Sequence, residues 1–307
     1  MLGSSHFLHW LSTVWAHVGQ AVATAWPPIW AFLESNFITA LAGSAAGAFG
    51  GAFAAQRIAE RNASFEETLT YVRNSNSATT FAVGVANELT GLKRQFVVPL
   101  ARDFTALVDR HEAHRVLAAN AAMPPFHFNP DMKFIAAPAT PINELGDILR
   151  ATAGEDPVAW MIFQMLRSII ATLDNMLAQR NEVLEEMRTL PPDRRLDAVA
   201  LYLGIPRADG NTDGRHVEIM KELPRVVDDA LGFSRVLAEH MAERATTVAS
   251  QFGKKAPKVR PADFSRADAL GVFPEMQEFR DELARVRGAK VDPSAVAAQS
   301  EPLVGPA

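Results

Sequence analysis

The chain has 307 residues, no cysteine and a formal net charge of −5. This length allows one large domain or two small ones. The absence of cysteine excludes disulfides, thiol catalysis and cysteine-ligated metals, and the mild acidity gives no electrostatic reason to expect a nucleic-acid partner. The charges are unevenly spread, because Glu34 is the only Asp, Glu, Lys or Arg among the first 56 residues. The chain therefore divides into an uncharged N-terminal part and a polar remainder.

The first 33 residues contain four of the five tryptophans, and residues 7–26 fit a helix with one apolar face. Tryptophan favours the membrane–water interface, so we predict an amphipathic helix that lies along a membrane surface. Pro27 and Pro28 should end it. The predicted interface residues are Trp10, Trp15, Trp26 and Trp30. An alternative is a helical hairpin, in which residues 7–33 form a first membrane span and 34–36 form the turn.

Residues 34–56 are predicted to form a single transmembrane helix. The 22 positions between Glu34 and Arg57 carry no charge, and at about 1.5 Å per residue they extend roughly 33 Å, which matches a bilayer core of about 30 Å. Small residues recur every fourth position, and such a face lets another helix approach closely. The predicted association face consists of Thr39, Gly43, Gly47, Gly51 and Ala55. Strongly apolar residues are few, so the alternative is a closely packed Ala/Gly helix inside a soluble protein.

Basic residues set the predicted orientation. No Lys or Arg precedes the predicted span, whereas Arg57 and Arg61 follow it directly. Because basic residues remain on the cytoplasmic side, the C-terminal domain is expected in the cytoplasm, attached to a bacterial-type inner membrane.

Residues 57–288 are predicted to form an all-α domain, because apolar residues recur at helical spacing and alternation typical of strands is absent. We expect a break at 74–77, a kink at Pro99 and an ordered loop over 121–141, with an extended piece at 132–136. Helices are expected at 141–152, 157–190, 192–203, 215–252 with a bend at Pro224, and 274–286. The tail, 289–307, is rich in Ala, Pro and Ser and is expected to be disordered.

Two patterns in the sequence have some of the features of metal sites. His111 and His114 lie three residues apart on a predicted helix, and an i, i+3 pair can ligate a metal; the alternative is a solvated helix face, because Arg110 and Arg115 border them. Residues 209–214, DGNTDG, match only the first half of a calcium loop, since Met220 stands where a bidentate glutamate belongs. A polar turn is expected there.

The sequence contains no recognised catalytic or nucleotide-binding motif, and no cofactor is expected. The favoured hypothesis is a non-enzymatic, membrane-anchored helical scaffold or sensor that forms a homo-oligomer through residues 37–55. Its expected partners are the lipid bilayer, further copies of the chain and an unidentified cytoplasmic protein. The alternatives are an oligomeric pore-forming effector and a metal-dependent enzyme that uses His111 and His114.

Overall fold

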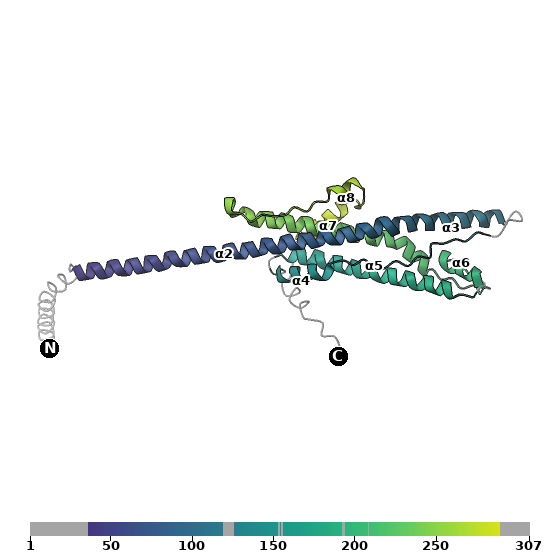
Figure 1. Ribbon diagram of the computed structural model, residues 1–307, viewed down its shortest axis with the longest axis horizontal. Coiled ribbons are helices and arrows are strands. Elements are labelled where there is room, and N and C mark those ends of the chain that lie inside the picture. Colours follow the sequence, from purple (N-terminus) through teal and green to yellow (C-terminus); the bar gives the residue numbers. More distant parts are fainter. Residues whose placement is uncertain are drawn as a thin grey trace, which may run out of the picture. The chain divides into compact units, whose positions relative to one another are not determined.

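The computed structural model describes residues 36–118, 126–152, 154, 156–191, 194–207 and 209–288 (Figure 1). These residues form helices and connecting segments with no β-strand, which confirms the predicted all-α class. The predictions for the N-terminal interfacial helix at 1–33 and for the tail at 289–307 lie outside the described residues. The chain divides into two compact units, residues 1–67 and residues 68–307.

The described part of the first unit is the N-terminal part of helix α2 (Asn36–Leu92). Every side chain described between Gly43 and Ser64 is exposed. This includes three large apolar residues, since Phe49 is 78%, Phe53 66% and Ile58 61% exposed. This stretch therefore has no hydrophobic core of its own.

The prediction of a transmembrane helix at 34–56 is not supported. Among the residues that the structure describes, no helix combines the length and the apolar content needed to cross a membrane. Helix α2 is long, but most residues from Gly43 to Ala55 are glycine, alanine or serine, and a mainly polar and charged stretch begins at Gln56. Small side chains contribute little to hydropathy, so this composition lowers the mean even where charge is absent.

The predicted break at 74–77 is wrong, because α2 continues through these residues. Their polar side chains serve tertiary contacts instead of ending the helix. The Asn76 side-chain amide donates to the Lys258 carbonyl at 3.0 Å and accepts from the Arg260 amide at 2.8 Å. Asn76 thus binds the backbone of residues 258–260, the segment that follows α7, through both a donor and an acceptor.

A π-helical turn at Lys93–Val97 separates α2 from α3 (Val98–Ala118). Pro99 has no amide hydrogen, so the helix cannot make the usual bond from position 99 to the carbonyl of Gln95. The amide of Val98 bonds instead to the carbonyl of Lys93, five residues earlier. The irregularity predicted at Pro99 is therefore present as a wider turn just before it.

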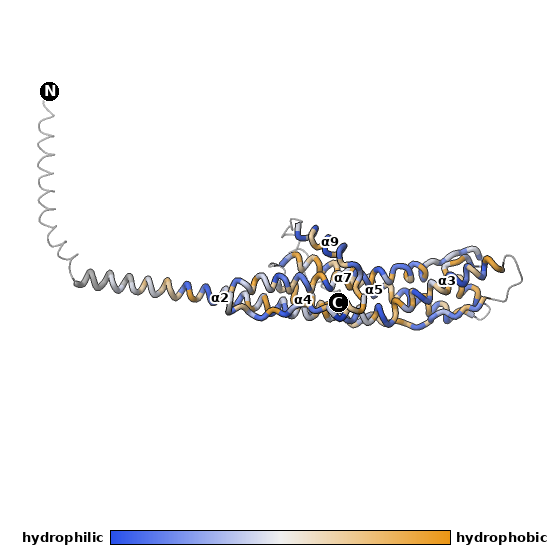
Figure 2. The backbone as a smooth tube through the Cα atoms, turned by 90° about the horizontal axis from the view of Figure 1, so that it is seen from above, coloured by the Kyte–Doolittle hydropathy of each residue, from blue (hydrophilic) through white to orange (hydrophobic). Residues whose placement is uncertain are grey.

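The second unit is built around α5 (Pro157–Thr189) and α7 (Arg215–Ser250), which pack against each other. Both carry apolar residues at helical spacing, visible as the alternating colours in Figure 2. Residues 78–92 of α2 and helix α3 complete the core. The shorter helices are α4 (Ile142–Thr152), α6 (Arg195–Leu203), α8 (Ser265–Ala269) and α9 (Gln277–Gly288).

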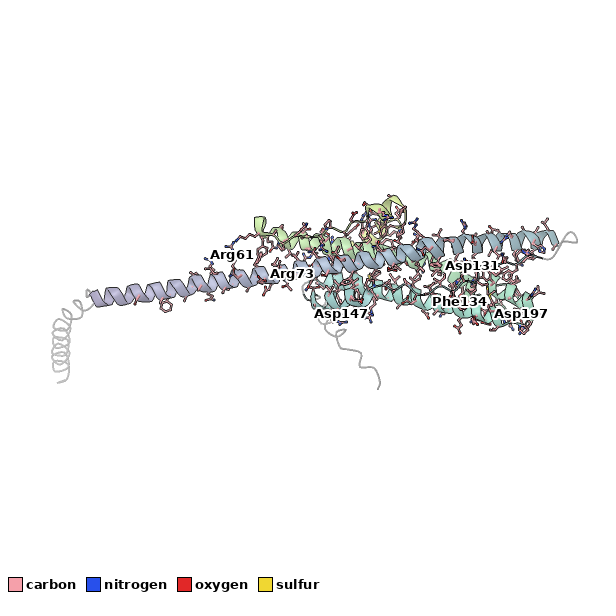
Figure 3. The ribbon with its side chains drawn as sticks, viewed as in Figure 1. Arg61, Arg73, Asp131, Phe134, Asp147 and Asp197 are labelled. Atoms are coloured by element: carbon pink, nitrogen blue, oxygen red, sulfur yellow. The ribbon has the colours of Figure 1, made fainter. Side chains whose placement is uncertain are left out.

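An extended strap, residues 126–141, runs along α5, as the predicted ordered loop should. Asn181 holds its middle with two hydrogen bonds to the backbone of Ile135, at 2.8 and 3.1 Å. Arg180 donates to the Lys133 carbonyl at 2.8 Å. The guanidinium of Arg188 lies 4.1 Å from the ring centre of Phe134, which Figure 3 labels on this strap.

Helix α9 packs on α7 at Gly232. A Cβ atom at Gly232 would collide with the ring of Phe279, so only glycine leaves room for this aromatic side chain. Phe233 packs edge-to-face on the same ring, with 5.3 Å between centroids. The contact explains why a short helix, whose other residues are mostly polar, remains attached to the bundle.

Candidate functional site

The predicted association face is open along the residues whose side chains are described. Gly43, Gly47 and Gly51 are exposed, and apart from adjacent residues and the backbone of the helix itself no heavy atom lies within 4 Å of the position a Cβ would take at any of them. Ala55 is also exposed, while the side chain of Thr39 lies outside the described residues. The side chains described on this face are therefore not covered by other described residues of the chain.

The two basic residues predicted to follow the span are both exposed. The guanidinium of Arg57 lies 6.0 Å from the ring centre of Phe53, and Arg61 is labelled on α2 in Figure 3. The predicted interface residues Trp10, Trp15, Trp26 and Trp30 lie outside the described residues.

His111 and His114 lie on α3 and both contact Phe126. Their ring centroids are 5.1 and 5.6 Å from that of Phe126. Within the described residues no group of three or more His, Cys, Asp or Glu side chains is arranged to hold a metal ion. The structure thus gives these histidines a packing role against the start of the strap.

The 209–214 segment is a polar turn closed by its own side chains. Asp209 accepts from the amide of Asn211 at 2.9 Å, and Asp213 accepts from the side chain of Arg215 at 2.7 Å. Arg215 also bonds to Glu186 of α5 at 2.7 Å. Asp209 thus closes the turn, and Asp213 is engaged in fixing the start of α7.

One set of buried ionisable groups among the described residues surrounds Asp156, at the N-terminus of α5. Asp156 is 3% exposed, and its Oδ1 accepts from the amide of Ala159 at 3.0 Å, which caps the helix. Its two oxygens lie 3.0 and 3.1 Å from Nε2 of His240, which is equally buried. The hydroxyl of Tyr71 donates to Oδ2 at 3.3 Å. One carboxylate therefore joins α2, α5 and α7.

The hydrogen bonds fix the tautomer of His240. Nη2 of Arg287 in α9 lies 2.9 Å from Nδ1 of His240. Arginine can only donate, so Nδ1 must accept, and the ring proton resides on Nε2 and points to Asp156. Both ring nitrogens are thus engaged, and α9 becomes the fourth helix joined to the cluster.

The charges around Asp156 favour its ionised form. Burial alone would raise its pKa, but the hydrogen bond from His240, the amide of Ala159 and the guanidinium of Arg244 together hold the pKa of Asp156 below its ordinary value. Burial, followed by the charge of Asp156, raises the pKa of Tyr71. The tyrosine therefore remains a neutral donor, and the carboxylate remains an acceptor.

A pocket of about 340 Å³ opens beside this pair. Its floor includes Asp156 and His240, and its rim includes Glu243, Arg244 and Arg287. The Nε atom of Arg244 lies 3.7 Å from Oδ2 of Asp156, beyond a hydrogen bond. The remaining lining residues are Pro157, Val158 and Thr247.

A second buried polar group comprises Arg180, Tyr202 and His216. Arg180 and His216 have no exposed surface. Nδ1 of His216 donates to the carbonyl of Tyr202 across 2.9 Å. Burial lowers the pKa of His216 to about 4 and raises the pKa of Tyr202 to about 12. Both side chains are therefore neutral at neutral pH and serve the interior of the bundle.

Sequence reasoning predicted a helix that begins at residue 157, directly after Asp156, and singled out neither His240 nor Arg287 as a site residue. Asp156 and His240 are 84 positions apart, and His240 and Arg287 are 47 apart. The one local signal was the Asp156–Pro157 pair, which is typical of a capped helix start.

Comparison with known proteins gives no relative for this chain: no protein-family model, no curated protein and no solved structure matches it.

Proposed function

We propose that the chain is a non-enzymatic helical scaffold or sensor that self-associates through the N-terminal part of α2. One observation carries the proposal: from Gly43 to Ile58 the helix exposes large apolar side chains and, on the side opposite Phe49 and Phe53, an open face of small residues. Apolar surface of this kind marks a site of interaction with protein or lipid. The bundle of the second unit is then the part that binds a partner or a signal.

The free energy of burying apolar side chains favours a state in which this part of α2 is in contact with protein or lipid. Complete burial of a Phe or Ile side chain is worth about 1.5–3 kcal/mol, and Phe49, Phe53 and Ile58 are all mostly exposed. A helix with no packed face is also only marginally stable in water. Association of several copies would bury the small-residue face and bring their backbones close together.

The environment proposed for this segment is a membrane, with the second unit in the cytoplasm. The support is the uncharged stretch between Glu34 and Arg57 and the position of Arg57 and Arg61 directly after it. Fractionation tests this part: the protein should remain in the membrane after a carbonate wash, and the second unit should resist protease added to intact spheroplasts. Release by carbonate would contradict the membrane assignment but would leave self-association open.

A non-enzymatic role is supported by the state of the two histidines that are buried among the described residues, His216 and His240. In His240 both ring nitrogens are engaged, by Asp156 and Arg287. His216 has no exposed surface. Neither imidazole is therefore placed to exchange a proton with a substrate.

Self-association is tested with two double variants of the full chain in detergent, measured by light scattering and cross-linking. Gly47→Leu with Gly51→Leu fills the small-residue face and should reduce the oligomer to smaller species. Leucine also has the higher helix propensity, so unfolding of the helix would not explain the loss. Phe49→Leu with Phe53→Leu is the matched control, because it changes the opposite side, and it should retain the oligomer. Equal association of the glycine variant and the parent chain would refute the proposal.

A further inference from the structure

The pocket beside Asp156 presents guanidinium groups from two different helices. Arg244 lies on α7 and Arg287 on α9, and both line the same 340 Å³ space. We propose that this pocket binds the phosphate or carboxylate group of a small anionic molecule. This inference is independent of the self-association proposed above.

Both arginines have capacity for a further acceptor. The side chain of Arg244 is 43% exposed, and its closest acidic neighbour, Oδ2 of Asp156, lies beyond hydrogen-bond distance at 3.7 Å. The side chain of Arg287 is 41% exposed. A guanidinium has five N–H groups in a planar fork that matches an oxyanion. Two forks facing one pocket can hold one such group between them.

Glu243 now occupies the position of such an anion on Arg287. Its Oε2 accepts from Nη2 of Arg287 at 2.7 Å, and its side chain is 63% exposed. An ion pair this exposed contributes little stability, because solvent screens it. A ligand oxyanion can therefore replace the Glu243 carboxylate, and Glu243 should weaken binding through like-charge repulsion.

The buried floor of the pocket tolerates an anion at the rim. Asp156 is negatively charged, but it accepts hydrogen bonds from His240, Tyr71 and the Ala159 amide, which disperse its charge. The same bonds fix His240, and His240 in turn orients Arg287. The two buried side chains thus act as positioning residues for the rim.

The test is equilibrium dialysis of the full chain with radiolabelled inorganic phosphate at constant ionic strength. We expect one saturable site per chain. Removing one guanidinium, in Arg244→Gln or Arg287→Gln, should weaken binding about tenfold or more, as for other hydrogen bonds to charged groups. Glu243→Gln should tighten it about threefold or more, because one negative charge leaves the rim.

Arg225→Gln is the matched control. Arg225 also lies on α7 and is paired with acidic residues, Glu222 and Asp229, but it does not line the pocket. Its loss should leave phosphate binding unchanged. Displacement of the label by glycerol 3-phosphate would indicate a free phosphomonoester, and tighter displacement by short-chain phosphatidic acid would indicate a lipid headgroup; both support an oxyanion site.

Three results would overturn the inference: no saturable binding of phosphate, unchanged binding in both arginine variants, or weaker binding in Glu243→Gln. The last variant keeps the test decisive even if Arg287→Gln disturbs α9, since Glu243 is exposed and lies on the surface of α7.

Discussion

At the scale of single residues, the buried ionisable groups make stability depend on pH. His216 is packed against the rings of Tyr202 and Phe104, with centroids 4.1 and 5.7 Å away. Its folded-state pKa of about 4 lies well below the ordinary value of 6.5. Between these two values the unfolded chain holds a proton that the folded chain does not, so stability falls as the pH is lowered through this window.

Replacement of His216 by Phe should remove this dependence. The shift between 6.5 and about 4 corresponds to about 3 kcal/mol lost on acidification. In urea titrations between pH 6.5 and 4.5, the His216→Phe chain should lose less free energy of unfolding than the parent. His127→Phe is the control, since His127 is exposed and should leave the slope unchanged. Identical slopes for His216→Phe and the parent would show that His216 does not carry the effect.

Asp156 contributes to the pH dependence of stability at lower pH than His216 does. Its folded-state pKa lies below the ordinary value, so the stability it provides is present above that value and is lost as the pH falls through the folded-state pKa. The contributions of His216 and Asp156 to stability can thus be distinguished by pH, because the contribution of His216 is lost first on acidification.

At the scale of helices, local chemistry predicted many boundaries and failed where the partner is distant in sequence. Helix α5 begins after the Asp156 cap and runs Pro157–Thr189, close to the predicted 157–190. Helix α6 ends at Gly204, whose φ of 62° suits glycine. The break expected at 74–77 was wrong because the partners of Asn76 lie more than 180 residues away. A local sequence pattern cannot predict contacts between residues so far apart. The cluster around Asp156 was not predicted for the same reason, because its members are also distant in sequence.

The attachment of α9 depends on the missing side chain of Gly232. Gly232→Ala places a methyl group against the buried ring of Phe279 and should destabilise the chain by about 1–3 kcal/mol, as overpacked cores do. Adding Phe279→Ala creates space, so the double variant should lose less than the sum of the two single losses. Urea unfolding measures all three.

Gly84→Ala provides the control for this pair. Its new Cβ would meet Pro141 at an ordinary contact distance of 3.4 Å, and it should cost little. Strict additivity of the Gly232 and Phe279 changes would show that the two residues do not share this contact.

At the scale of the whole molecule, the hydrophobic core belongs to the second unit alone. The cluster of buried residues extends from Ala78 to Phe279. The described residues of the first unit, in contrast, are almost entirely exposed. The second unit therefore buries its apolar residues within itself. The described apolar residues of the first unit can be buried only against another molecule or against residues outside the described part of the chain.

A chain consisting of residues 68–288 should therefore fold without the first unit. We expect a monomer with a helical circular dichroism spectrum and a single cooperative thermal transition, measured together with light scattering. The full chain, in detergent, serves as the comparison and should form the larger species. An unfolded fragment would show that residues before 68 contribute to the core.

The position of Trp160 gives such a fragment its own optical reporter. Of the five tryptophans, the other four precede residue 34, so residues 68–288 contain a single indole. Trp160 is 4% exposed and lies one turn after Asp156, where its ring is 5.3 Å from that of Phe163. Its emission should therefore report on the N-terminal turn of α5 without an added label, shifting to longer wavelength on unfolding and responding to ligands that enter the neighbouring pocket.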